Sequence, residues 1–197
     1  MEWSDHQDWE SNWWGDCLRT YGEEEKQIRY AGLMGLSVLR DNHSPYIDLQ
    51  GKSVLDVGGG PVSLLLKCIN RGPSVVIDPC QYPSWTIERY KASGINYFKQ
   101  KGEEQLTYDC GPAYFDEVWM YNVLQHTDDP EQICKNCLHW GKIVRIFDWV
   151  NAGVGKGHPH DLKPDLLDTW LKGEGKITMY GQWQQYHGVF IGEHYGK

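Results

Sequence analysis

The chain has 197 residues, of which 40% are hydrophobic and 13% aromatic, so it is long enough to bury the core of one domain. Its formal charge of −8 is opposite to that of proteins that bind nucleic acids by neutralising phosphates. No apolar run reaches the roughly 18 residues of a membrane-crossing helix, and the N-terminus is acidic rather than signal-like. We therefore expect a globular, cytoplasmic protein.

The first 51 residues are expected to form a helical cap that is separate from the main domain. Four tryptophans, at positions 3, 9, 13 and 14, precede a helical stretch at about residues 23–39, whose first turn is acidic, as is favourable at a helix N-terminus. Tryptophan is large enough to shape a pocket, which favours a lid over a ligand-binding edge. Simple packing of this segment onto the main domain remains the alternative.

Residues 52–197 are predicted to form an α/β domain. Short apolar strands alternate with helices: strands at 53–57, 74–77, 96–99, 117–121 and 142–147, and helices at 63–70, 84–93 and 130–138. A glycine-rich loop, a helix at 164–171 and strands at 176–180 and 188–191 follow. This order predicts a doubly wound, mostly parallel sheet of seven strands, with helices on both faces and a C-terminal antiparallel hairpin.

The first strand of this domain leads directly into the glycines Gly58, Gly59 and Gly60. Glycine at such a turn lets a ligand approach the backbone closely. Asp56, at the end of the strand, would repel a pyrophosphate but suits a cationic amino acid group. The pattern therefore favours S-adenosylmethionine over a dinucleotide, and a nicotinamide oxidoreductase stays possible only if Asp56 points away from the site.

The sequence Val54-Leu-Asp-Val-Gly-Gly-Gly-Pro61 resembles the first motif of class I S-adenosylmethionine-dependent methyltransferases. The resemblance implies that Asp78 binds the ribose and that the segment after the fourth strand lies near the methionine part. It also implies that Gly102-Glu103-Glu104 lines the adenine, although Lys101 stands where the family usually has an acid. The contacts implied for the cofactor are Tyr30, Asp56, Gly58, Gly59, Gly60, Asp78, Pro79, Gly102, Glu103, Glu104, Asn122, Val123 and Gln125.

His126, just after the fourth strand, is the candidate general base, because imidazole titrates near neutrality. The alternative is a structural histidine that orders residues 127–130. Asp148, after the fifth strand, is a second candidate for orienting the acceptor. Trp13, Trp14, Tyr21, His158 and His160 are the candidate contacts of the methyl acceptor.

No metal ion is predicted. A metal-dependent O-methyltransferase would be expected to have an acid after the fourth strand, where this chain has Tyr121-Asn122, so the pair His158 and His160 is assigned to the acceptor pocket. The Cys-x-x-Cys of Cys134 and Cys137 lacks the second pair that a structural zinc site requires. These two cysteines are expected to be small buried residues on one face of a helix.

The predicted reaction is methyl transfer from S-adenosylmethionine to an oxygen or nitrogen of a small molecule, with S-adenosylhomocysteine as product. Methylation of a nucleobase, nucleotide or nucleic acid is an alternative. The tripeptide at 79–81 resembles the nucleophile loop of cytosine C5 methyltransferases, but it follows the second strand instead of the fourth. A module that binds the cofactor without catalysis is the other alternative, and the sequence leaves the oligomeric state open.

Overall fold

A computed structural model describes residues 3–41, 44–107 and 114–194, with side chains from residue 8 onward. Its main sheet has seven strands in the order β6-β5-β3-β7-β8-β10-β9. Their bounds are β3 (Val54–Val57), β5 (Ser74–Asp78), β6 (Asn96–Lys99), β7 (Phe115–Tyr121), β8 (Gly141–Val150), β9 (Lys176–Tyr180) and β10 (Trp183–Ile191). Only β10 runs antiparallel to its neighbours, β8 and β9. The predicted α/β architecture with a C-terminal antiparallel hairpin is confirmed.

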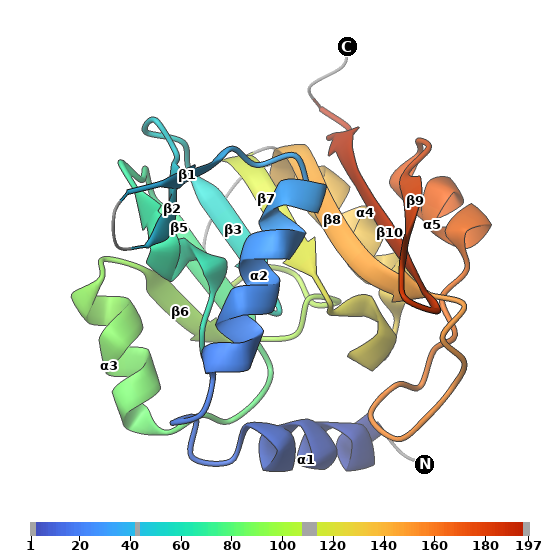
Figure 1. Cartoon of the computed structure of the whole chain (residues 1–197), viewed down its shortest axis with the longest axis horizontal. Helices are drawn as coiled ribbons and strands as arrows, with labels where there is room; N and C mark the ends of the chain where they lie inside the picture. The colour runs from blue at the N-terminus through green and yellow to red at the C-terminus, as the bar shows by residue number, and fades with distance from the viewer. Residues whose placement is uncertain (1–2, 42–43, 108–113, 195–197) are drawn as a thin grey trace.

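Helices cover both faces of this sheet (Figure 1). On one face lie α4 (Pro130–Trp140) and α5 (Pro164–Leu171), and on the other α2 (Tyr21–Leu33) and α3 (Ser84–Ala92). Successive side chains of a strand point to opposite faces, and in β7 Val118 and Met120 enter the first core while Trp119 and Tyr121 enter the second. The nearly continuous apolar strands are thus explained by burial on both sides.

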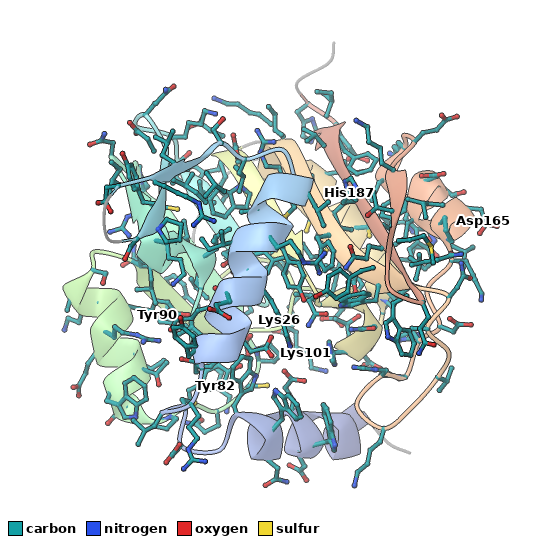
Figure 2. The ribbon with its side chains drawn as sticks, viewed as in Figure 1. Lys26, Tyr82, Tyr90, Lys101, Asp165 and His187 are labelled. Atoms are coloured by element: carbon teal, nitrogen blue, oxygen red, sulfur yellow. The ribbon has the colours of Figure 1, made fainter. Side chains whose placement is uncertain are left out.

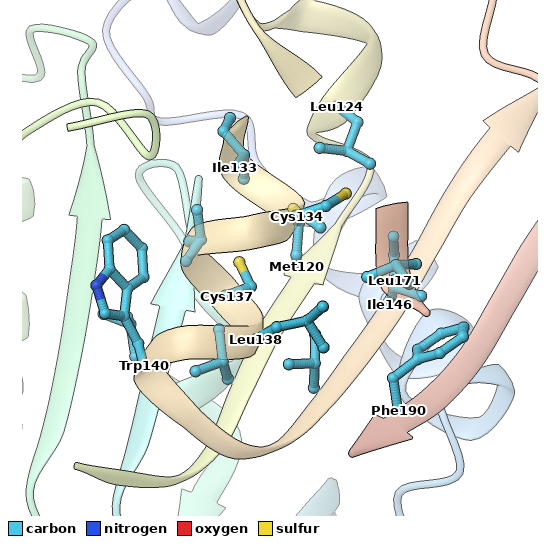
Figure 3. Packing of buried hydrophobic residues seen from close by; sticks show 14 of the residues in the cluster. Met120, Leu124, Ile133, Cys134, Cys137, Leu138, Trp140, Ile146, Leu171 and Phe190 are labelled. Carbon is cyan, nitrogen blue, oxygen red and sulfur yellow. The ribbon is translucent and has the colours of Figure 1, made fainter. Parts of the chain in front are cut away.

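Helix α4 presents a row of small and branched side chains to the sheet (Figure 3). Its Cys134 and Cys137 are fully buried and pack in the same core as Met120 and Ile146. The helix begins at Pro130, and the Asp129 side chain accepts a hydrogen bond from the backbone N–H of residue 132, 3.0 Å away. The Cys-x-x-Cys is therefore a packing feature of this helix.

The helix predicted over residues 23–39 is wrong beyond residue 33, because α2 ends at Leu33. Gly35 has a φ of +75°, and Leu36 N–H donates to the carbonyl of Ala31 over 2.9 Å. A left-handed glycine with such a bond is a common helix terminator. The chain then continues as β1 (Val38–Arg40), which pairs with β2 (Pro45–Asp48).

The helix predicted at residues 63–70 is also wrong. It is a single turn of 3-10 helix, η1 (Leu64–Lys67), followed by β4 (Cys68–Ile69). Ser63 caps the turn through its side chain, but Cys68 and Ile69 pair in parallel with β2. Strand pairing therefore ends the helical turn, and β1, β2 and β4 form a second, three-stranded sheet that local sequence patterns did not indicate.

Helix α1 (Trp3–Trp14) crosses the end of the main sheet toward which β3, β5 and β7 point (Figure 1). Tyr82 lies at this end, facing α1 (Figure 2), and belongs to a small apolar cluster with Cys17, Cys80 and Trp14. This cluster attaches the N-terminal segment to the domain. None of the helices in the described part of the chain combines the length and apolar character needed to cross a bilayer.

Candidate functional site

Two adjoining cavities lie where β3, β5 and β7 end, beneath α1, and each encloses about 60 Å³. They share Glu10, Gly58, Asp78 and Asn122. The first is further lined by Val57, Pro79, Cys80, Gly102, Glu103, Val123, His126, Thr127 and Ile133. The second is further lined by Trp14, Glu23, Gln27, Tyr30, Gly59, Gly60 and Tyr121. Ligands of open α/β sheets bind at this carboxyl edge.

The glycine turn after β3 is fixed by its own neighbours. Gly58 has a φ of +70°, and a Cβ there would lie 2.6 Å from a methyl group of Val123. A Cβ at Gly59 would lie 2.8 Å from a carboxylate oxygen of Asp56. Gly60 also has a positive φ, of +63°. These glycines are required by backbone conformation and packing, and they bring bare backbone to the cavity wall.

Asp78, at the end of β5, is buried with its carboxylate at both cavities. It accepts hydrogen bonds of 2.9 Å from the N–H groups of Gly60 and Cys80 and from the Tyr82 hydroxyl. Burial raises the pKa of Asp78 to about 6, and these donors oppose the rise. The carboxylate is thus held rigidly beside the glycine turn.

Asp56 is fully buried but is not part of either cavity wall. Its Oδ2 accepts hydrogen bonds from Ser63 Oγ at 2.5 Å and from the Tyr121 hydroxyl at 2.7 Å. Burial raises the pKa of Asp56 to about 7, against the effect of these two donors. Asp56 therefore lies behind the glycine turn, and the sequence had not indicated Ser63 or Tyr121 as its partners.

One end of the first cavity contains Pro79, Gly102 and Glu103. Glu103 Oε1 accepts bonds from the backbone N–H groups of residues 128 and 129, at 3.0 and 3.2 Å, so the side chain is fixed against the loop after β7. Glu104 is exposed and outside both cavities. Of the two glutamates named from the sequence, the structure brings only Glu103 to this wall.

The second cavity is bounded by α2. Tyr30 is buried and stacked on Phe147, with 3.9 Å between ring centroids, and burial raises the pKa of Tyr30 to about 12. Gln27 donates from Nε2 to the carbonyl of Val62 at 2.5 Å, while its buried Oε1 has no hydrogen-bond partner among the described residues. A buried orphan acceptor at a cavity wall is available to a ligand donor.

Asn122 lies where the two cavities meet and has a left-handed backbone, with a φ of +58°. Its Oδ1 accepts a bond from Gln125 Nε2 at 3.2 Å. Gln125 is buried behind Asn122 and is not a lining residue of either cavity. Asn122 and Val123 are therefore cavity residues, whereas Gln125 supports them.

His126 contacts both the loop near residue 157 and α1. Its Nδ1 lies 2.8 Å from the carbonyl oxygen of Gly157 and 3.4 Å from Glu10 Oε2. Glu10 also accepts a bond of 2.9 Å from Trp14 Nε1. Burial is the main cause of the raised pKa of Glu10. Glu10 is a cavity residue that sequence reasoning missed, since a lone acid in a polar N-terminal segment gives no signal.

Of the five residues predicted to contact the methyl acceptor, one lines either of the two cavities. Trp14 is a lining residue, whereas Trp13 and Tyr21 are largely exposed and are not. The His158 ring lies 4.6 Å from the His126 ring, centroid to centroid, and His160 Nε2 lies 2.9 Å from the carbonyl oxygen of residue 127. Neither of these two histidines lines a cavity.

Asp148 is fully buried and its carboxylate is directed to backbone groups. It accepts bonds from the N–H groups of Val123, Leu124 and Trp149 at 3.1, 2.7 and 2.8 Å. Burial raises the pKa of Asp148 to about 7 despite these bonds. It lies outside both cavity walls and holds the turn that carries Val123.

The walls of both cavities are acidic. Glu10, Asp78 and Glu103 line the first and Glu10, Glu23 and Asp78 line the second, and no lysine or arginine is among the lining residues that the structure describes. Such walls favour a cationic ligand and disfavour a pyrophosphate, because the latter would lack a counter-charge. The site therefore offers carboxylates, backbone N–H groups and flat apolar surface.

No protein-family model matches the chain. A curated protein named ubiquinone biosynthesis O-methyltransferase, from Pseudomonas fluorescens (strain Pf0-1), is 30% identical over 122 residues, which cover 60% of this chain and 52% of that protein. The chain thus spans about half the length of the curated relative that it matches.

Solved structures extend the likeness to nearly the whole chain. A SAM dependent methyltransferase from Aquifex aeolicus has a TM-score of 0.57 at 14% identity, over 97% of this chain and 100% of that one. Magnesium protoporphyrin IX methyltransferase from Synechocystis PCC 6803, solved with bound SAH, has a TM-score of 0.56 at 11% identity, over 86% and 82%. The chain therefore has the fold of the class I S-adenosylmethionine-dependent methyltransferases.

Proposed function

We propose that the protein binds S-adenosylmethionine in the two adjoining cavities and transfers its methyl group to an oxygen or nitrogen of a small molecule. The observation that carries this proposal is the acidic, lysine- and arginine-free wall formed around a glycine turn at the carboxyl edge of the sheet. When bound, this cofactor supplies a methyl carbon activated by a positively charged sulfonium.

The residues present fit the cofactor at each end. Asp78 offers carboxylate oxygens to ribose hydroxyls, and Glu103 with Gly102 and Ile133 forms the wall proposed for the adenine. At the other end, the orphan Oε1 of Gln27 is an acceptor for an ammonium group. The backbone of Gly58 to Gly60 lines the space between them.

We propose His126 as the general base for the acceptor. A carbonyl oxygen can only accept, so the 2.8 Å contact with Gly157 requires the proton on Nδ1. Nε2 is then the basic nitrogen that takes the acceptor proton, and the nearby carboxylate of Glu10 stabilises the imidazolium that results. Asp148, whose bonds all go to backbone N–H groups, acts in this scheme by positioning the loop before His126.

The N-terminal segment is proposed to act as a lid. Through Glu10 and Trp14, α1 contributes to both cavities, and a Cβ at Gly157 would lie 2.3 Å from the Trp9 ring, so helix and loop are in close contact. A deletion of residues 1–20 should abolish turnover and weaken cofactor binding by less than tenfold. If the deleted protein keeps its fold by circular dichroism and still turns over, the lid proposal is wrong.

A small-molecule acceptor is supported by the acidity of the site and by the overall charge of −8, which disfavour nucleic acid. The curated relative is named as an O-methyltransferase, so hydroxyl compounds are the first acceptors to screen. The five cysteines of the described ranges are buried thiols, which supports a cytoplasmic location.

Calorimetric titration with S-adenosylhomocysteine tests the cofactor. We expect one-to-one binding by the wild type, at least tenfold weaker binding by Asp78→Asn, a loss of about 1.4 kcal/mol, and unchanged binding by the exposed control Asp165→Asn. If the folded wild-type protein does not bind S-adenosylhomocysteine, the proposal is wrong. Binding without turnover of any hydroxyl or amine compound would favour a non-catalytic module.

The base is tested once an acceptor is found. His126→Asn should lower kcat at least a hundredfold at neutral pH, because the proton then has no acceptor, while S-adenosylhomocysteine affinity changes little. Glu10→Gln should shift the lower limb of the pH–rate profile. If His126→Asn has the same pH–rate profile as the wild type, His126 is not the base and only orders the loop.

A further inference from the structure

A second group of chemically suited side chains lies far along the chain from the cavities. His139 is in the last turn of α4, and Glu193 and His194 follow the end of β10. One nitrogen of each imidazole and a carboxylate oxygen of Glu193 all lie within 4.8 Å of one another. Within the described ranges, this is the one set of three histidine, cysteine or acidic side chains grouped closely enough to share an ion.

The backbone holds these residues together. After β10, Gly192 N–H donates to the carbonyl of Lys142 and Glu193 N–H to that of Leu138, each over 2.9 Å. A Cβ at Gly192 would lie 1.8 Å from the carbonyl oxygen of Gly141, so only glycine allows this approach. The segment that carries two of the three side chains is therefore fixed against the end of α4 whether or not a ligand is bound.

The two imidazoles have the geometry of a shared ligand pair. His194 Nε2 lies 3.1 Å from His139 Nδ1, and the rings are inclined by 76°. Two nitrogens that each lie about 2.0–2.1 Å from one tetrahedral ion are about 3.3 Å apart. Both rings are on exposed residues, and α4 adds the partial negative charge of its C-terminal carbonyls. The spacing of the two nitrogens is thus already close to that of two ligands of one ion.

The Glu193 carboxylate already has a cationic partner. Its Oε1 is paired with Lys172 Nζ, an ammonium that competes with any cation for this carboxylate. Lys172 lies at the C-terminal cap of α5 with a left-handed backbone, and its side chain is 62% exposed, so it can swing into solvent. A metal ion would replace it as the partner of Glu193.

We propose that His139, Glu193 and His194 form a site for a divalent transition-metal ion of the zinc class, which ties the end of β10 to the end of α4. Two imidazole nitrogens and one carboxylate oxygen suit zinc, cobalt, nickel or copper better than magnesium or calcium, which prefer all-oxygen sites. The fourth position is open to water. This site is separate from the methyl-transfer cavities and does not depend on the proposed function.

The test is titration of the full chain with Zn²⁺ in competition with a chromogenic chelator. We expect one zinc per chain in the wild type, and binding at least tenfold weaker in His139→Ala and in His194→Ala. Glu193→Gln should weaken binding several-fold, whereas Lys172→Gln should strengthen it, because it removes the competing ammonium. His158→Ala is the matched control, since it removes one ring of the other histidine pair, and it should bind as the wild type does.

The wild-type reference and all variants carry Cys110→Ser, because residue 110 lies outside the described residues and a thiol is itself a zinc ligand. Thermal unfolding in the presence of EDTA should be the same for all of them, and added zinc should raise the Tm of the wild type but not of the double variant lacking both imidazoles. Equal affinity in wild type and the two alanine variants, or loss of binding only in His158→Ala, would overturn the proposal. Absence of saturable binding would leave a direct hydrogen bond between the rings as their sole interaction and would overturn it as well.

Discussion

Asp56 should make the protein less stable as the pH rises, and replacing it by asparagine should remove this dependence. Its pKa is raised from an ordinary 3.8 to about 7, chiefly by burial. The folded state therefore retains a proton that the unfolded state has released. The resulting stabilisation is fully present below pH 3.8 and is lost as the pH rises through 7. Between pH 5 and pH 8, the loss from this one group amounts to about 2 to 3 kcal/mol.

The substitution Asp56→Asn keeps an oxygen that can accept from Ser63 and Tyr121, whose hydroxyls can rotate. Urea unfolding followed by tryptophan fluorescence should be measured at pH 5, 6, 7 and 8 for both proteins. The stability of wild type relative to Asp56→Asn should fall by about 2 to 3 kcal/mol between pH 5 and pH 8. The other titrating groups are common to both proteins. If the two curves of unfolding free energy against pH are parallel, Asp56 is therefore not a buried acid with a raised pKa.

Two further substitutions test the turn after β3 and a buried ion pair. Gly58→Ala should lower the free energy of unfolding by about 2 kcal/mol or more and weaken S-adenosylhomocysteine binding. Gly94 has the same φ of +70° but open space around it, so Gly94→Ala should lower the free energy of unfolding by only about 1 kcal/mol. Equal losses in the two variants would contradict the packing argument. Burial by itself raises the pKa of Glu117, but bonds led by that from Arg145 at 2.7 Å outweigh burial and lower it. Glu117→Gln should therefore lose about 3 kcal/mol at pH 7 in urea unfolding, and a loss no larger than that of the partly exposed control Glu131→Gln would refute this.

Elements with a clear local signal were predictable from the sequence. Strand β5 contains the apolar run 75–77 and β7 the run 118–121, and α4 has both a capping aspartate and a proline at its start. The segments that were mispredicted are short or ambiguous. The end of α2 depends on Gly35, a signal that is present in the sequence. The helix predicted at 63–70 is instead shortened to the single turn η1 by pairing between β4 and β2, which are distant in the chain.

For the site, the sequence by itself determined the glycine turn, the acid at the end of β5 and the polar segment after β7, because each follows a recognisable strand. Only the tertiary structure decided that Asp56 lies behind the turn, that Asp148 holds backbone N–H groups, and that Glu10 reaches the cavities. The reason is physical: a strand end fixes where a residue lies, but the direction of its side chain and its partners depend on elements that are remote in sequence and meet only on folding.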